Sequence, residues 1–178
     1  MSRVSSLAIA ITLVVLAGCR KTPAVPASLN VANKVAVRTV SLFFEGPEML
    51  LAAETRDVAV PENPAGAIPV VMRELLEGPA NTAVPPLLPR DSVLRGAYLL
   101  PDGTAIVDLG GPTLTNGWGA GSHQELMAIY SIVQTVVTNF PEARRVRVLV
   151  NGSPAETLGG HVSLARSITP APGVLARR

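Results

Sequence analysis

The chain has 178 residues, with 15 lysine and arginine residues against 13 aspartate and glutamate residues, so its formal net charge is +2. This near-neutral balance lacks the basic character of a nucleic-acid-binding protein, and aromatic residues, at 3% of the chain, are too few for a base-stacking surface. The single cysteine excludes a disulfide within one chain, so a folded domain must rely on its packed core.

The first residues predict export with lipid attachment. Residues 7–17 form an apolar run after Arg3, shorter than the ~20 residues that span a bilayer and typical of a signal peptide. The motif Leu16-Ala17-Gly18-Cys19 resembles the bacterial lipobox, in which the cysteine is acylated and the chain is cut just before it. The resemblance implies a signal peptide over residues 1–18, cleavage between Gly18 and Cys19, and a membrane anchor of acyl chains on Cys19. The alternative is an ordinary secretory signal with a chance cysteine.

Proline and small polar residues predict an extended tether over residues 19–33 and a disordered tail over residues 170–178, with one domain at residues 34–169 between them. These features predict a lipoprotein on the extracytoplasmic side of the cell envelope. Because Arg20, and not an aspartate, follows the cysteine, the outer membrane is favoured if the cell has two membranes.

The predicted elements of the domain are strands and amphipathic helices. Residues 34–44 alternate apolar and polar side chains and predict a strand, whereas residues 49–60 are ambiguous between a helix and a strand that returns as a hairpin. Apolar residues at helical spacing predict a helix over residues 64–77. Residues 93–100 and 104–109 flank a Pro-Asp-Gly turn and predict a second hairpin.

The second helix is predicted to follow a glycine-rich loop at residues 116–121. Ser122 and Glu125 have the spacing of a capping box, which predicts the helix start, and Pro141 ends the helix. Residues 146–150 then predict a strand. Two amphipathic helices that each need a sheet to cover predict an α+β layer sandwich.

Several short motifs of the sequence resemble the GerMN domain, a family named for a spore-germination lipoprotein. The resemblance runs from about residue 35 to residue 168. It implies a β-α-β-β-α-β two-layer sandwich like the ring-building modules of envelope complexes, with no catalytic activity and no cofactor. It also implies interaction or assembly with other envelope proteins, and leaves self-association open. The motifs are Glu54 with Arg56, Leu75 to Pro79, Val107 to Leu109, Gly121-Ser122, Glu125, Ile129, Ser131 to Val133, Thr135, Val146 to Gly152, Glu156 to Leu158, Gly160-His161 and Leu164.

The chain departs from the family pattern in two respects. Leu109-Gly110-Gly111-Pro112 stands where the family often has a serine and an aromatic residue, and only one copy of the domain is present where the germination protein has two. The single copy leaves a specific role in sporulation open.

Three residues are candidates for partner binding. Trp118, beside Asn116 in the glycine-rich loop, is either an interface anchor or part of a flexible entry to the helix. His161 is expected to brace the last turn by a hydrogen bond, and His123 to be solvated near the helix start. A hydrolase that uses His161 with Asp108 requires the two side chains to meet. The acidic and histidine residues are otherwise too scattered to predict a metal site.

Three functions therefore stand beside one another. The first is a lipid-anchored interaction or assembly module, the second an exported domain that binds a cell-wall fragment or small solute, and the third the hydrolase.

Glu54 and Arg56 are further predicted to form an ion pair that closes the first hairpin. At an exposed site such a pair would contribute only ~0–1 kcal/mol to stability.

Overall fold

The computed structural model describes residues 34–46 and 48–177, so the predicted signal peptide, cleavage site and tether lie outside the described residues. Within the described ranges, no helix is both long enough and apolar enough to span a membrane.

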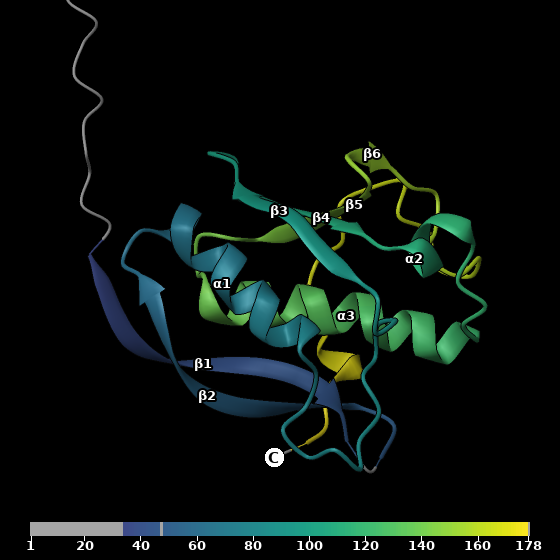
Figure 1. Ribbon diagram of the computed structural model, residues 1–178, viewed down its shortest axis with the longest axis horizontal. Helices are drawn as coiled ribbons and strands as arrows, with labels where there is room; N and C mark the ends of the chain where they lie inside the picture. Colours follow the sequence, from purple (N-terminus) through teal and green to yellow (C-terminus); the bar gives the residue numbers. More distant parts are fainter. Residues whose placement is uncertain (1–33, 47, 178) are drawn as a thin grey trace, which may run out of the picture. The chain divides into compact units, whose positions relative to one another are not determined.

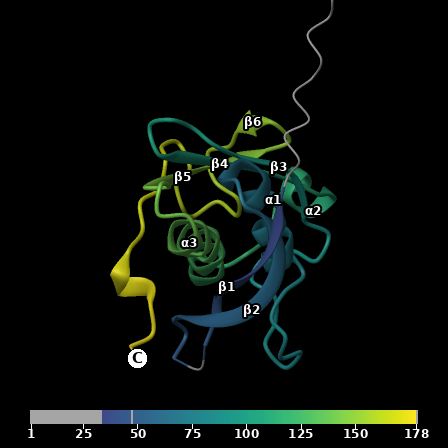
Figure 2. The same ribbon diagram turned by 90° about the vertical axis from the view of Figure 1, so that its left-hand side faces the viewer.

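The described residues form three layers, which Figures 1 and 2 show from two directions. A hairpin of β1 (Val35–Glu45) and β2 (Leu51–Pro61) forms one outer layer, and the sheet of β3, β4, β5 and β6 forms the other. Helices α1 (Pro64–Leu76) and α3 (Ser122–Asn139) lie between them and supply much of the buried core. The predicted α+β class is confirmed, but the two-layer arrangement is wrong, because β1 and β2 form a separate sheet on the other side of the helices.

The ambiguous segment at residues 49–60 is a strand. β2 pairs with β1 in antiparallel register, from Val35 opposite Pro61 to Glu45 opposite Leu51. Val58 and Val60 are buried on the face that meets the helices, whereas Ala59 is exposed. This alternation of exposure, and not the helix-forming residues at its start, determines the strand conformation.

The second sheet combines a hairpin with a helical crossover. β3 (Val93–Leu99) and β4 (Thr104–Gly110) are antiparallel around the predicted turn, where Gly103 has φ +79°, and β5 (Arg145–Val150) is parallel to β4. The connection from β4 to β5 contains the short helix α2 (Pro112–Asn116), which the sequence did not predict, and then α3. β6 (Ser153–Pro154) is a two-residue edge strand.

Helix α1 begins where an asparagine caps it. The side chain of Asn63 accepts a hydrogen bond from the Gly66 N–H at 2.7 Å, and Pro64 is the first helical residue. Both are typical of a helix start, because the first N–H groups of a helix have no partner within the helix. The buried face of α1 carries Ala67, Ile68, Val71, Met72 and Leu75.

Helix α3 carries a row of polar side chains that close part of an edge of the hairpin. The Ser131 hydroxyl donates to the Phe43 carbonyl at 2.6 Å, and the Phe43 N–H donates to Thr135 Oγ1 at 3.2 Å. The Asn139 amide accepts from the Ser41 N–H at 2.9 Å and donates to the Ser41 carbonyl at 2.7 Å. The i, i+4, i+8 spacing places the three side chains on one face of the helix, so they satisfy backbone groups that β2 does not reach.

The prediction of a disordered tail over residues 170–178 is wrong for the described part of that segment. Residues 172–174 form a single 3-10 turn, and Leu175 makes a parallel bridge with Leu51. The Ala176 N–H donates to the Leu51 carbonyl at 2.9 Å, and the Gln134 side chain donates to the Ala171 carbonyl at 3.2 Å. Because α3 and β2 provide backbone and side-chain partners, the proline-containing segment is held in place, as Figure 2 shows beside α3.

Candidate interaction site

A buried carboxylate at the start of α3 organises the loops around it. The Glu125 side chain is fully buried, and the residue belongs to the first turn of a helix that begins after Gly121. Its Oε1 accepts hydrogen bonds from the N–H groups of Leu158 and Gly159, both at 2.8 Å. Its Oε2 accepts from the N–H groups of His161 at 2.7 Å and Val162 at 3.2 Å.

The predicted capping box is therefore wrong. The helix is capped by Gly121 without a side-chain hydrogen bond, and Glu125 faces the loop at residues 156–162 and not the helix start. The spacing of Ser122 and Glu125 is suited to a capping box. The loop, however, provides four backbone N–H donors, and the carboxylate forms its hydrogen bonds with these instead of with the helix start.

The charge of Glu125 is stabilised by these donors. Burial raises the pKa of the Glu125 carboxyl, but the N–H groups of Gly159, His161, Leu158 and Val162 together outweigh it and leave the pKa below its ordinary value. Glu125 is consequently an ionised group without contact with solvent, which fixes the positions of the four donors.

The glycine-rich loop and the loop at residues 156–162 meet at this carboxylate. A Cβ atom on Gly159 would lie 3.2 Å from the Trp118 carbonyl oxygen and 3.3 Å from both the Ala120 Cβ and Glu125 Oε2. A side chain at position 159 would press against all three, so glycine permits the close approach of the two loops.

The structure brings the three candidate residues into this pair of loops. Trp118 is half-buried and packs against the core, so it is only partly accessible, while Asn116, at the end of α2, is exposed. The His161 ring is 45% exposed, and its Nδ1 lies 3.2 Å from Glu125 Oε2. The predicted bracing hydrogen bond of His161 is present, through both its backbone and its ring.

The side chains of the hydrolase hypothesis do not pair. Asp108 Oδ1 accepts from the Gly152 N–H at 2.8 Å, and its Oδ2 lies 3.5 Å from Arg95 Nε, whereas His161 contacts Glu125. His123 lies 3.3 Å from Glu45 Oε1. Among the residues that the structure describes, no group of three or more histidine, cysteine, aspartate or glutamate side chains has the arrangement of a metal site.

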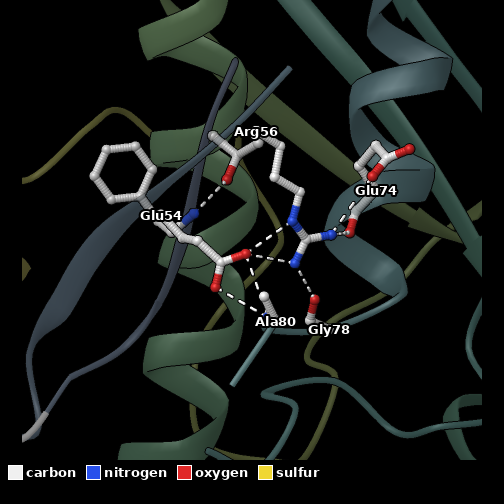
Figure 3. A network of polar contacts seen from close by, with 7 residues as sticks. Glu54, Arg56, Glu74, Gly78 and Ala80 are labelled. Atoms are coloured by element: carbon white, nitrogen blue, oxygen red, sulfur yellow. Dashed lines mark hydrogen bonds and ion pairs between the residues drawn. The ribbon is translucent and has the colours of Figure 1, made fainter. Parts of the chain in front are cut away.

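A second polar network joins β2 to the end of α1 (Figure 3). Arg56 contacts the Glu54 carboxylate at 2.6 Å and donates to the carbonyl oxygens of Glu74 at 3.2 Å and Gly78 at 2.5 Å. The Ala80 N–H donates to Glu54 Oε2 at 3.0 Å. The predicted ion pair of Glu54 and Arg56 is present, but it holds the residues after α1 in place and does not close the hairpin.

Sequence reasoning missed two features of these sites: the loop partner of Glu125 and the polar row on α3. The second was visible as Ser131, Thr135 and Asn139 at helical spacing on an otherwise apolar helix. The first had no local signal, because 33 residues separate Glu125 from Leu158.

These elements define an α+β domain of the GerMN type, and comparison with solved structures agrees. A chain described as "Putative Lipoprotein from Clostridium perfringens" aligns with a TM-score of 0.54 and 21% identity, covering 75% of this chain and 88% of that one. The first GerMN domain of the sporulation protein GerM from Bacillus subtilis aligns with a TM-score of 0.53 and 20% identity, covering 79% and 98%. The tandem GerMN domains of the same protein give 0.51 and 18%, covering 80% of this chain and 47% of theirs.

The family follows from the sequence match. Residues 41–156 match the Germane family, described as "Sporulation and spore germination", so the chain belongs to that family and the predicted GerMN resemblance is confirmed. No similar protein was found among curated sequences.

Proposed function

We propose that this protein is a lipid-anchored, non-catalytic interaction module of the cell envelope. Four features support the proposal: the lipobox-like motif ending at Cys19, the Germane family match, the fold shared with a protein described as a lipoprotein, and the use of the most promising histidine for structural contacts. The anchor would hold the domain at a membrane, where its surface meets envelope proteins.

The observation that carries the interaction role is the pair of loops organised by Glu125. The carboxylate holds the backbone of residues 158–162 through four hydrogen bonds, and Gly159 brings this loop against Trp118. A pre-ordered surface loses little conformational entropy when it binds, and a partly exposed tryptophan is a common anchor residue of interfaces. The pair of loops that carries Asn116, Trp118 and His161 therefore has the properties of a docking surface.

Cross-linking in cells followed by mass spectrometry tests the docking surface. We expect the native chain to capture a reproducible envelope protein, and Trp118→Ala to lose most of that capture. Tyr98→Ala is the matched control, because Tyr98 is an exposed aromatic residue on β3 and lies outside the two loops. Equal capture by both variants would contradict a docking role for the Trp118 loop, and recovery of wall fragments alone would contradict the interaction module.

The anchor has a separate test. Cys19→Ala removes the proposed acylation site, so the variant is expected to leave the membrane fraction after a high-salt wash, while the native chain stays. If the variant remained as tightly bound, the lipid anchor would be wrong, whatever the cross-linking shows.

Ligand binding is a second candidate function, because one cavity has a suitable size. A hollow of about 490 Å³ lies between the hairpin and the C-terminal segment, lined on the apolar side by Phe43, Leu51, Ala53 and Leu175, with Ser41 and Thr138 as polar groups. Small-molecule sites commonly have volumes of about 300–1,000 Å³. Titration calorimetry with soluble cell-wall fragments tests it: saturable heat that Ala53→Trp abolishes supports this function, and the absence of heat with the native chain contradicts it.

A further inference from the structure

One edge of the first hairpin is only partly closed. The outward backbone groups of β1 belong to its odd-numbered residues, since Ser41 and Phe43 bond to α3 while the Glu62 N–H bonds to the carbonyl of Lys34 on the β2 side. Groups on one edge of a strand alternate in this way, so Val35, Val37 and Thr39 present their N–H and C=O groups to the same outward edge. Helix α3 ends at Asn139, and the described residues give these three no hydrogen-bond partner on that edge.

This open edge lacks the features that normally prevent strand pairing. Residues 35–39 contain no proline, and β1 pairs with β2 in regular register without a bulge. Val37 is 73% exposed and Val35 is 57% exposed, and the one basic side chain within the segment, Arg38, is held at the Asn139 carbonyl and over the Phe140 ring. Unprotected edges with apolar side chains are templates for another strand.

We propose that residues Val35–Thr39 of β1 pair in antiparallel register with the same residues of a second copy of this chain. The pairing would join two hairpins into one four-stranded sheet about a two-fold axis at Val37. The inference rests on the proposed function, since it supplies one partner for the interaction module.

The shape of the open segment favours a second copy over an unrelated strand. Helix α3 blocks the edge from Ser41 onward, so the segment available for pairing is centred on Val37. A two-fold register places Val37 opposite Val37 of the other copy and Val35 opposite Thr39, and the α3 helices of the two copies then lie at opposite ends of the shared strands. About six main-chain hydrogen bonds form in such a register.

The charges and the chain length are compatible with this register. Each Arg38 lies opposite Ala36 of the other copy, so no like charges face each other across the new pair. Fifteen positions separate Cys19 from Lys34, a distance of up to about 50 Å for an extended chain. Two copies anchored in one membrane can therefore both reach the pairing, and anchoring in a common plane raises their effective concentration.

The opposite edge of the hairpin, formed by β2, is protected against strand pairing in two ways. β2 carries Asp57 in the middle of its outward row, and the C-terminal segment already occupies that edge at Leu51. A charged side chain and a bound segment are both protection against edge pairing. Of the two edges of this hairpin, the β1 edge is therefore the one available for pairing with another chain.

Cysteine cross-linking of the full chain in its membrane tests the pairing. Val37→Cys is expected to give a product of twice the chain mass with a short bis-maleimide. Val93→Cys, at a 53% exposed valine on β3, and the chain without an added cysteine are the matched controls and are expected to stay monomeric. Monomer alone from Val37→Cys, or equal dimer from both cysteine variants, would overturn the proposal.

A second measurement removes the pairing without a cross-linker. In detergent extracts of the full chain, sedimentation should give a dimer for the native chain and for Val93→Lys, and a monomer for Val37→Lys, because two ammonium groups would face each other. Unchanged dimer in Val37→Lys would overturn the β1 register. A cross-linked product of another mass would overturn the second copy as the occupant while leaving the interaction module standing, so the two failures are distinguishable.

Discussion

The two networks that begin at Glu125 and at Arg56 hold loops in place by different means. Glu125 has no exposed surface, and its negative charge is stabilised by backbone N–H groups beside one histidine ring. Arg56 retains 19% of its side-chain surface and is bound by two carboxylates and two backbone carbonyls. One network is a buried anion in a cradle of amides, and the other is a partly solvated ion-pair cluster.

The difference shows how strongly each loop depends on a single side chain. Four N–H groups around Glu125 lose their acceptor if the carboxylate is removed, and buried donors without a partner are costly. The hydrogen bonds from Arg56 to the Glu74 and Gly78 carbonyls are only partly buried, so water can replace part of what the guanidinium provides. The loop pair that carries Trp118 should therefore fail sooner than the loop after α1.

The largest effect is expected for Glu125→Gln. The substitution keeps the size of the side chain, removes its charge and points an NH2 group at backbone donors, so we expect a loss of about 2–4 kcal/mol in the free energy of unfolding. Chemical denaturation measures it, with Gln124→Ala, at the exposed neighbouring residue, as control. Equal stability of the native chain and Glu125→Gln would show that the amide cradle does not support the fold.

Arg56→Met is expected to cost less, about 1–3 kcal/mol, because the methionine retains packing against Phe44 while two carbonyls lose a donor. Arg95→Met, at an arginine with 51% of its side chain exposed, is the control and should change stability by less than about 0.5 kcal/mol. A larger loss at Arg56 than at Glu125 would reverse the comparison.

Acidification should affect the native chain in a defined direction. The folded pKa of Glu125 lies below its ordinary value of 4.5, so the group contributes stability that is fully present above that value and is lost as the pH falls through the folded pKa. A protonated carboxyl and a glutamine amide each keep one carbonyl acceptor and point a donor at the backbone N–H groups, so the loss on full protonation approaches that of the substitution. Stability curves of the native chain and Glu125→Gln should converge below pH 4.5, and parallel curves would contradict the assignment.

The smallest effect is expected for His161→Ala. Its backbone N–H still donates to Glu125, and only a half-exposed ring is lost, so the change should stay below about 1 kcal/mol. Thermal unfolding measures it, with His123→Ala as a similarly exposed control. A loss as large as that of Glu125→Gln would mean that the ring, and not the backbone, completes the cradle.

Much of the fold followed from local patterns. The strand at residues 34–44, the helix at residues 64–77 and the hairpin around Gly103 were predicted close to their observed bounds, because side-chain period and turn chemistry act over a few residues. The ambiguous segment at residues 49–60 is a strand, because its side chains alternate between the buried and exposed faces while its backbone pairs with β1. α2 was missed because five residues contain too little periodicity to detect.

The candidate site was less accessible to sequence reasoning. Trp118 and His161 were identified one at a time, but nothing in their neighbourhoods indicated that the two loops touch. The capping-box prediction was reasonable locally and failed because four distant amide groups bind Glu125 more completely than the helix start would. A carboxylate with two possible sets of donors is placed by the tertiary structure.

The sequence by itself determined the family, the α+β class and most of the strands and helices, because these depend on side-chain periodicity and on short sequence motifs. The tertiary structure alone decided which backbone groups found partners: the loop around Glu125, the edge of β1 closed by α3 as far as Ser41, and the C-terminal segment beside Leu51. Hydrogen bonds between residues far apart in the chain depend on the three-dimensional arrangement of elements, and that arrangement leaves no local trace in the sequence.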